Sequence, residues 1–213
     1  MKKKLVQALL ACTFVGICII SCKKEQATST TTTTTTATKF TVVEIQTTSG
    51  NMLMWLYDKT PLHKNNFLKL IRQKFYDNLL FHRVVKDFVI QGGDPSGDGT
   101  GGVKNAIPAE IFPDLKHVYG AVGAARLDVS VNPDKKSNGS QFYIVVNKDG
   151  TSNLDGGYTV FGIIFSGMDA AMAISNVAVS NQRPLQDVHM TKVDTMAFTA
   201  EELLSKYKFT VPK

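Results

Sequence analysis

The sequence predicts one mostly β domain, closed into a barrel, behind an N-terminal targeting segment. Short apolar runs separated by Asn, Asp, Gly and Pro turns occur along most of the chain, which is typical of many short strands. Two segments inside this region have the apolar spacing of helices. A chain of 213 residues with 43% hydrophobic content is long enough for one sizeable core. A barrel is the architecture that removes the exposed edges of so many strands.

The domain opens with two strands and a helix. FTVVEIQ at 40–46 and NMLMWLY at 51–57 are β-branched or apolar runs on either side of a Ser-Gly pair, which predicts a hairpin. Thr60 and Pro61 then supply an N-cap and a proline at the first helical position, and apolar residues at helical spacing continue to Tyr76. We therefore expect a helix from this Thr-Pro pair to Tyr76.

The remainder of the domain consists of short strands with one more helix. The predicted strands are residues 80–90, interrupted at Lys86-Asp87, and residues 118–125, 141–146, 159–165 and 188–196. GMDAAMAISNV at 167–177 has Met and Ile at helical spacing and predicts the second helix. In the C-terminal tail, the capping-box pattern from Thr199 to Glu202 predicts a short helix.

The N-terminal segment has the three parts of a bacterial export signal. MKKK is basic, Leu5–Ile20 is an almost unbroken apolar run, and the run ends in Ile-Ile-Ser-Cys, which resembles a lipobox. We expect residues 1–21 to be a lipoprotein signal peptide and Cys22 to carry the lipid anchor. A plain secretory signal, or an uncleaved membrane anchor of about 16 residues, is the alternative.

Residues 22–38 would then be the lipidated cysteine and a Thr-rich flexible tether, because they contain no large apolar residue. Cleavage leaves Cys22 as the only cysteine, so an internal disulfide is excluded. It also removes three lysines, and the net charge falls from +6 (24 minus 18) to +3 (21 minus 18), so the charge does not imply nucleic acid. The expected location is the bacterial cell envelope outside the cytoplasm. The outer membrane is favoured over the inner because Lys23, not Asp, follows the cysteine.

The stretch QGGDPSGDGTGG at 91–102 combines glycines with potential oxygen ligands. As a calcium loop it would use Asp94, Ser96 and Asp98, but its twelfth position is Asn105 instead of the glutamate that coordination requires. As a phosphate loop it lacks the Gly-Lys-Ser/Thr ending and a following helix. We expect its aspartates to accept backbone N–H groups in tight turns.

The preceding residues carry a longer pattern. FHRVVKDFVIQGGD at 81–94 resembles the signature of the cyclophilins, which are peptidyl-prolyl cis-trans isomerases. Further blocks follow in the family's order: GTGG at 99–102, GAVGAAR at 120–126, NGSQFYI at 138–144 and LDGGYTVFG at 154–162. The resemblance implies a closed eight-stranded antiparallel cyclophilin-like barrel with two capping helices. It places the isomerase domain at 39–196 and leaves 197–213 as a tail.

The resemblance also implies the site residues. It makes Arg83 the catalytic arginine, which stabilises a pyramidal prolyl nitrogen or holds the carbonyl oxygen. The other implied roles are a proline pocket lined by Phe88, Val89, Tyr143 and Leu154, orientation of the substrate backbone and of the arginine by Gln91 and Gln141, backbone pairing with the peptide at Ala125 and Arg126, and closure of the site by Tyr158.

The chemistry agrees with such a site. Rotation about an X-Pro bond crosses a barrier of ~18–20 kcal/mol but breaks no bond, so neither a nucleophile nor a metal or cofactor is required. An apolar slot and a fixed cationic donor suffice. The expected partners are proline-containing polypeptides, bound by a monomer. The alternatives are a proline-peptide binding or chaperone module with little turnover, and a calcium-dependent adhesin.

Two departures from the family pattern bear on selectivity. Asn153 stands where better-known members carry a tryptophan that contacts cyclosporin, so we expect weak cyclosporin affinity. The insertion LDVSVNPDKKS at 127–137 lengthens the loop beside the site and is expected to adjust which peptides enter.

Overall fold

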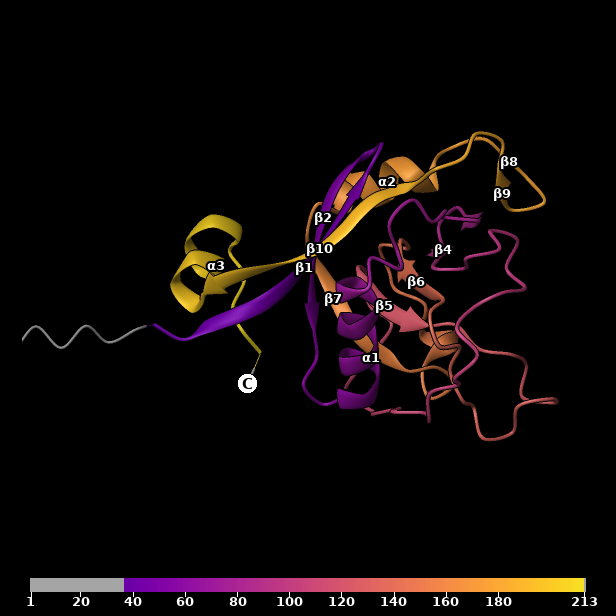
Figure 1. Ribbon diagram of the computed structural model, residues 1–213, viewed down its shortest axis with the longest axis horizontal. Helices are drawn as coiled ribbons and strands as arrows, with labels where there is room; N and C mark the ends of the chain where they lie inside the picture. The colour runs from indigo at the N-terminus through magenta and orange to yellow at the C-terminus, as the bar shows by residue number, and fades with distance from the viewer. Residues whose placement is uncertain (1–36, 213) are drawn as a thin grey trace, which may run out of the picture. The chain divides into compact units, whose positions relative to one another are not determined.

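The computed structural model describes residues 37–212, which form a mostly β domain (Figure 1). Eight strands make one antiparallel sheet in the order β10-β1-β2-β7-β5-β6-β4-β3. Their bounds are β1 Lys39–Thr47, β2 Gly50–Leu56, β3 Arg83–Val85, β4 Val89–Gly92, β5 Ala121–Ala124, β6 Phe142–Val145, β7 Val160–Ser166 and β10 Met190–Thr199. The other elements are α1 Pro61–Arg72, α2 Met168–Ser175, α3 Ala200–Tyr207, a 3-10 turn at Ser152–Leu154, and a separate hairpin of β8 Val179–Ser180 and β9 Arg183–Pro184.

The sheet curls into a half-barrel, so the complete closure expected from the sequence is wrong. Within residues 37–212 no ladder joins β3 to β10. The two ends of the sheet meet at an isolated bridge between Leu80 and His189, beside which the N–H of Asn78 donates to the carbonyl of Met190 (2.7 Å). The β8–β9 hairpin explains the gap. It lies against the outer edge of β3, where the N–H of Val84 donates to the carbonyl of Gln182 (2.7 Å), and this occupies the edge that a closing strand would need.

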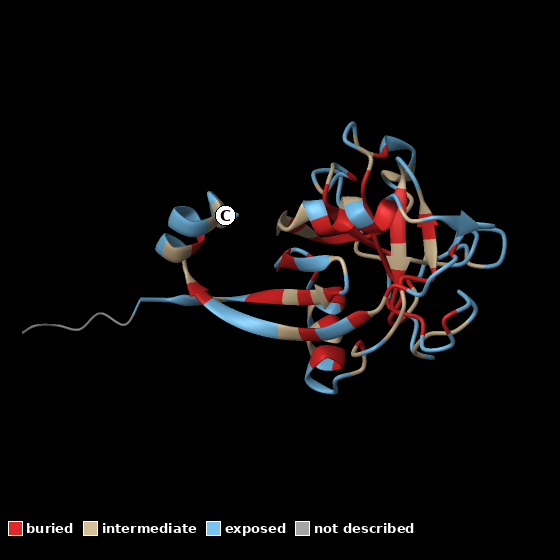
Figure 2. Cartoon of the chain, turned by 90° about the horizontal axis from the view of Figure 1, so that it is seen from above, coloured by how far each residue is buried: buried red, intermediate tan, exposed pale blue. Residues whose placement is uncertain are grey.

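The main core fills the inside of the curl, between the sheet and the inner faces of α1 and α2. Helix α1 contributes Phe67, whose ring lies 4.7 Å from that of Tyr76 and 5.4 Å from that of Phe142. From α2, Ala171 and Ile174 are completely buried. Buried residues accordingly run along the strands in Figure 2, whereas α3 is mostly exposed.

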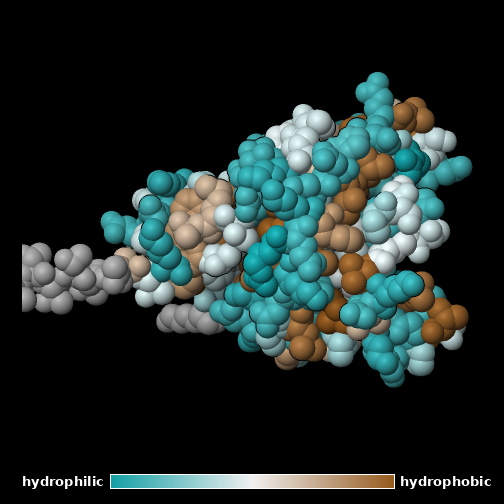
Figure 3. Space-filling model, in the orientation of Figure 1, coloured by the Kyte–Doolittle hydropathy of each residue, from teal (hydrophilic) through white to brown (hydrophobic). Residues whose placement is uncertain are grey.

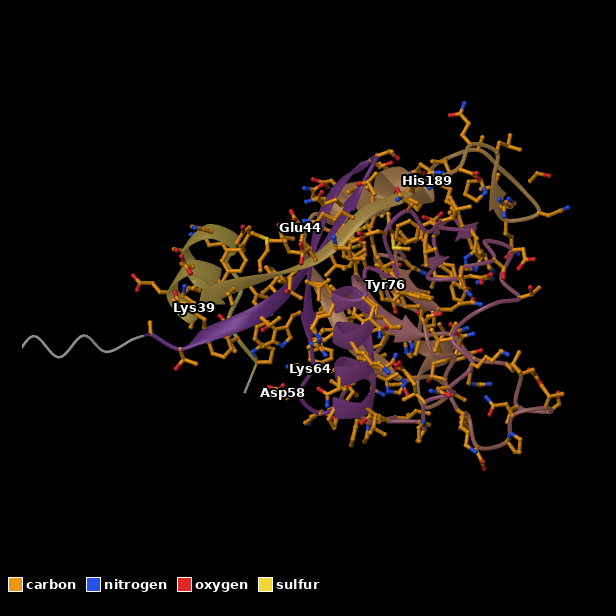
Figure 4. All side chains as sticks on the ribbon, viewed as in Figure 1. Lys39, Glu44, Asp58, Lys64, Tyr76 and His189 are labelled. Carbon is orange, nitrogen blue, oxygen red and sulfur yellow. The ribbon has the colours of Figure 1, made fainter. Side chains whose placement is uncertain are left out.

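Helix α1 begins at Pro61 as predicted but ends at Arg72, four residues before Tyr76. The backbone turns left-handed at Lys74 (φ 55°), which ends the helix and returns Tyr76 to the core. The Tyr76 hydroxyl then donates to the carbonyl of Ser140 (3.1 Å), and Figure 4 shows this side chain lying beside α1.

The N-terminus of α1 is capped by a residue distant in sequence. Thr60 makes no side-chain cap; the carboxylate of Glu110 instead accepts from the N–H groups of Leu62 and His63, each at 3.0 Å. A carboxylate at this end also complements the helix dipole. The same first turn carries an ion pair between Lys64 and Asp58 (2.5 Å), labelled in Figure 4. Sequence spacing could identify the start of this helix but not its long-range cap.

The C-terminal tail covers the outer face of β1, β2 and β7. Helix α3 has the predicted capping box, in which Thr199 Oγ1 accepts from the N–H of Glu202 and the Glu202 carboxylate accepts from the N–H of Thr199. Phe209 follows the helix; its ring stacks on that of Phe165 at 4.3 Å and lies tilted against that of Trp55 at 5.5 Å. A second apolar cluster therefore joins the tail to the sheet.

The predicted signal peptide, the lipid site at Cys22 and the tether up to residue 36 lie outside the described residues. Among the helices that the structure describes, none combines the length and the apolar character that a bilayer-spanning segment requires.

Candidate active site

A cavity of about 240 Å³ opens between the strands at the β3 end of the sheet. Its lining residues are Arg83, Phe88, Val89, Gln91, Ala125, Arg126, Tyr143, Leu154 and Tyr158. These are nine of the ten residues that the sequence analysis assigned to substrate and catalysis. The tenth, Gln141, lies behind the wall and bonds to Gln91. We call this space the proline cavity.

Strand register brings the key side chains to one face. Arg83 of β3 pairs with Gln91 of β4, and Gln91 pairs with Tyr143 of β6. Directly opposite residues in antiparallel strands project to the same side of a sheet, so these three side chains meet at the cavity. The next partner in this row is Gly123 of β5, where a Cβ would lie 2.3 Å from the Tyr143 ring. This glycine leaves the room that the ring occupies.

A chain of amide side chains holds Arg83 from the β4 side. Nη1 of Arg83 donates to Oε1 of Gln91 (3.3 Å), and Nε2 of Gln91 donates to Oε1 of Gln141 (2.9 Å). The Gln141 amide then donates to the carbonyls of Gly99 and Gly101, at 3.0 and 2.7 Å. Each amide is fixed at both ends, so the guanidinium has a defined position before any substrate arrives.

Gln182 holds Arg83 from the opposite side and was not among the residues predicted from the sequence. Nε of Arg83 donates to Oε1 of Gln182 (2.7 Å), which belongs to the turn of the β8–β9 hairpin. Asn181 and Gln182 both have positive φ angles, 48° and 68°. The Asn-Gln pair is not one of the strong hairpin signals, so nothing in the sequence pointed to this contact. Partial burial lowers the pKa of Arg83 from its ordinary value, but an arginine remains charged at neutral pH.

A second network supports the floor of the cavity and was also missed. The Tyr143 hydroxyl lies 2.9 Å from Nε2 of His117, and Nδ1 of His117 lies 2.8 Å from the carboxylate of Asp155. Burial lowers the pKa of His117, which favours a neutral ring. Because a carboxylate only accepts, Nδ1 carries the proton, and Nε2 therefore accepts from the tyrosine hydroxyl. The hydroxyl thus points away from the cavity, whose wall receives only the apolar face of the ring.

The three buried histidines share one electrostatic property. Burial is the largest cause that lowers the pKa values of His63, His82 and His117, in each case against the effect of a nearby carboxylate. His82 is 6% exposed, and neither of its ring nitrogens has a hydrogen-bond partner among the described residues. No proton transfer is required of these rings by the chemistry of the site.

The remaining wall combines apolar surface with one more cation. The ring of Tyr158 meets that of Tyr143 edge-on at 6.0 Å, and the Arg126 guanidinium lies 4.2 Å from the centre of the Tyr158 ring. Nε of Arg126 donates to the carbonyl of Gly157 (2.8 Å). This contact between arginine and tyrosine fixes the rim of the slot.

The backbone N–H and carbonyl of Arg126 lie beside the cavity and are available to pair with a peptide. Ala125 donates its N–H to Gln141 (3.0 Å) and accepts from Asn138 (2.7 Å). Within residues 37–212, neither the N–H nor the carbonyl of Arg126 makes a hydrogen bond. Of the two positions assigned to peptide pairing, Arg126 is therefore the one with both groups available.

The glycine-rich loop is a turn structure, as expected. Asp94 accepts from the N–H groups of Ser96, Asp98 and Gly99, and Asp98 accepts from that of Thr100. Among residues 37–212 there is no group of three or more His, Cys, Asp or Glu side chains placed to hold a metal ion.

Known proteins resemble this chain in sequence and in fold. Residues 42–195 match the family model for cyclophilin type peptidyl-prolyl cis-trans isomerases. The peptidyl-prolyl cis-trans isomerase cypE of Dictyostelium discoideum is 38% identical over 154 residues, covering 70% of this chain and 94% of the relative. Peptidyl-prolyl cis-trans isomerase-like 1 of Bos taurus is 36% identical over 155 residues, covering 70% and 89%.

A solved structure extends the likeness to three dimensions. A cyclophilin type isomerase of Cryptosporidium parvum, determined in the presence of the dipeptide Ala-Pro, has a TM-score of 0.67 and 29% identity. The alignment covers 73% of this chain and 98% of that one. The family match, the relatives and the shared fold agree: the chain belongs to the cyclophilin-type peptidyl-prolyl cis-trans isomerases.

Proposed function

We propose that Arg83 accelerates rotation about X-Pro bonds by a non-covalent mechanism, and that the substrates are exported or unfolded proteins in a bacterial cell envelope. The observation that carries the mechanism is the position of Arg83. Its guanidinium lines the proline cavity together with Phe88 and Leu154, and is held from both sides by glutamine side chains.

The physical basis is a difference between two states of the amide. In the planar state the nitrogen lone pair is conjugated with the carbonyl; in the twisted state it is localised on nitrogen. A fixed cationic donor binds the nitrogen lone pair more strongly once that pair is localised in the twisted state, whereas a donor to the carbonyl oxygen would only hold that atom in place. An acceleration on the order of a million-fold requires about 8 kcal/mol of such preferential binding.

Arginine suits this role because it keeps its charge and has five donor hydrogens. Nε and Nη1 of Arg83 are engaged by Gln182 and Gln91, whereas Nη2 donates to no described residue. The face of Tyr143 and the side chains of the slot would hold the proline ring away from water, which strengthens the interaction.

A rate assay on the full chain tests the mechanism. Protease-coupled isomerisation of a proline peptide is compared for wild type, Arg83→Ala and Arg83→Lys, with Arg72→Ala, an exposed arginine at the end of α1, as the matched control. We expect kcat/KM to fall by about 100-fold or more for the alanine variant, the range typical of removing one positioned donor, with partial recovery in the lysine variant. Equal rates for wild type and Arg83→Ala would refute the arginine-assisted mechanism. Peptide binding without any acceleration would instead favour the binding or chaperone module.

The location rests on the sequence alone. The signal anatomy, the lipobox resemblance and Lys23 support a protein anchored through Cys22, with the outer membrane favoured over the inner. Metabolic labelling with a fatty acid, comparing wild type with Cys22→Ala, tests the anchor. Label retained by the alanine variant, or absent from both proteins, would refute it.

A further inference from the structure

A second cavity, of about 340 Å³, adjoins the proline cavity. Its lining residues include Lys104, Arg126, Leu127, Val131 and Lys136. We call it the basic cavity. Three of its residues, Gln91, Ala125 and Arg126, also line the proline cavity. A peptide with its proline in the proline cavity therefore places a neighbouring side chain at the basic cavity.

The lining of the basic cavity is positively charged. Lys104, Arg126 and Lys136 contribute three cations, and no Asp or Glu is among the lining residues. Two of the cations lack an acidic partner. Arg126 donates to the carbonyls of Gly157 and Leu127, which are neutral, and Lys104 forms no ion pair or hydrogen bond with any residue in 37–212. Lys136 is paired with the exposed Asp134 at 3.0 Å.

Apolar side chains line the same space. Val103, Ala106, Leu127 and Val131 contribute aliphatic surface, and Leu127 and Val131 are 69% and 71% exposed. The loop that carries Leu127, Val131 and Lys136 is the one that the sequence analysis identified as an insertion. It projects on the side of the domain opposite α3 in Figure 1, where hydrophobic residues are prominent among hydrophilic ones in Figure 3. An occupant with methylene groups and a terminal negative charge matches both features.

We propose that the basic cavity selects an acidic side chain, glutamate before aspartate, close to the proline. The enzyme would then act preferentially on acidic prolyl segments. This inference rests on the proposed binding of the proline in the neighbouring cavity. It follows from the three cations, the absence of an acidic lining residue, and an aliphatic wall that accommodates the longer of the two acidic side chains.

The size of the preference follows from solvent exposure. An ion pair at a partly exposed site contributes a factor of about 1.4 to 5 in affinity. With Lys104 and Arg126 near the substrate carboxylate, and Lys136 shared with Asp134, we expect kcat/KM for a glutamate peptide to exceed that of the matching glutamine peptide by about 3- to 10-fold. The lysine peptide should be slower than both. Raising the salt from 0.1 to 1 M shortens the screening length from about 10 to about 3 Å, so the preference should shrink.

The experiment uses the full chain and peptides that differ at one position. Glu, Gln or Lys is placed two residues before the proline in one series and two residues after it in the other. We expect the preference for Glu in at least one series, and its reduction towards 1 in the double variant Lys104→Gln, Lys136→Gln. Lys148→Gln, an exposed lysine that lines neither cavity, is the matched control and should keep the preference.

The outcomes separate this inference from the proposed function. Equal kcat/KM for the three peptides in both series, or a preference that the double variant retains, would overturn the inference while leaving isomerisation intact. If no peptide is accelerated, the proposed catalytic mechanism fails. The inference is then decided by binding, from titration of isotopically labelled protein with the same peptides. Equal Kd values for Glu and Lys peptides would overturn it.

Discussion

Removal of one hydroxyl tests the network beneath the proline cavity. In Tyr143→Phe the ring remains, but Nε2 of His117 loses the donor that lies 2.9 Å away in the wild type. Tyr143 and His117 are 4% and 2% exposed, so water does not readily replace the missing group. The substitution therefore leaves a buried acceptor without a partner, while Asp155 still fixes the other ring nitrogen.

The magnitude follows from this geometry. A buried polar atom left without its hydrogen bond costs about 1–3 kcal/mol of folding free energy. For a domain of this size, each kcal/mol lowers Tm by about 2–4 °C, so we expect a decrease of about 2–12 °C. The isomerase rate should change by no more than about twofold, because the face of the ring that lines the proline cavity is unchanged.

Thermal unfolding at pH 7.5 and the peptide assay measure the two quantities. Tyr158→Phe is the matched control, because it removes the same atom from a half-buried ring that lines the same cavity and whose hydroxyl has no hydrogen-bond partner among the described residues. We expect its Tm to stay within about 1 °C of wild type. If Tyr143→Phe is as stable as Tyr158→Phe, the network contributes nothing to folding and the reasoning is refuted.

Four further outcomes are expected. Gln182→Gly should lower kcat/KM by about 3- to 10-fold, because it removes the hydrogen-bond acceptor of Arg83 Nε. It should not lower Tm, because glycine readily adopts a φ of 68°. Asn181→Gly, in the same turn, should leave both kcat/KM and Tm unchanged. Gln182→Glu should lower kcat/KM more than Gln182→Gly does, although the glutamate still accepts a hydrogen bond from Arg83. A rate equal to that of wild type would contradict this. Phe209→Ala should destabilise the fold by about 2 kcal/mol in urea unfolding, since it removes the ring stacked on Phe165; an unchanged midpoint would show that the tail contributes no stability. Stability should fall as pH decreases through about 6.5, because the three buried histidines have lowered pKa values and the unfolded chain binds more protons there; a higher urea midpoint at pH 5.5 than at pH 8 would contradict it.

Local patterns predicted most of the fold. The hairpin of β1 and β2, the start of α1, the break between β3 and β4, and the capping box of α3 all depend on residues within a few positions of one another. Features that depend on distant residues were not predictable. The end of α1 is set by a left-handed Lys74. Its N-terminal cap is Glu110, which lies 48 residues from Leu62 in the sequence.

The half-barrel has the same origin. Strand counting and the family resemblance both favoured closure, because neither contains information on what lies against the outer edge of β3. The β8–β9 hairpin has two residues in each strand and a turn of Asn181 and Gln182, too short for a strand pattern. Its backbone contact with Val84 decides whether that edge is available.

For the candidate site, the motif predicted which residues lie together but not how they are held. Nine of them line one cavity, and the strand register places three of these, Arg83, Gln91 and Tyr143, in a row. The residues that were missed, Gln182 and His117, contact the motif only through side chains from separate segments. The hydroxyl of Tyr143 was the one available signal, since a buried tyrosine requires a hydrogen-bond partner.

The way in which Arg83 is held suits it to the proposed catalytic role. Its side-chain partners among the described residues, Gln91 and Gln182, are neutral amides, and no carboxylate contributes to the shift of its pKa. A carboxylate partner would fix the guanidinium equally well but would offset its charge in a partly buried site, where charges interact strongly. Amide acceptors define the direction of the donors and leave the full positive charge for the substrate. Catalysis by differential binding needs a donor that is both oriented and fully charged. An oriented donor without its charge would bind the planar and twisted amides equally.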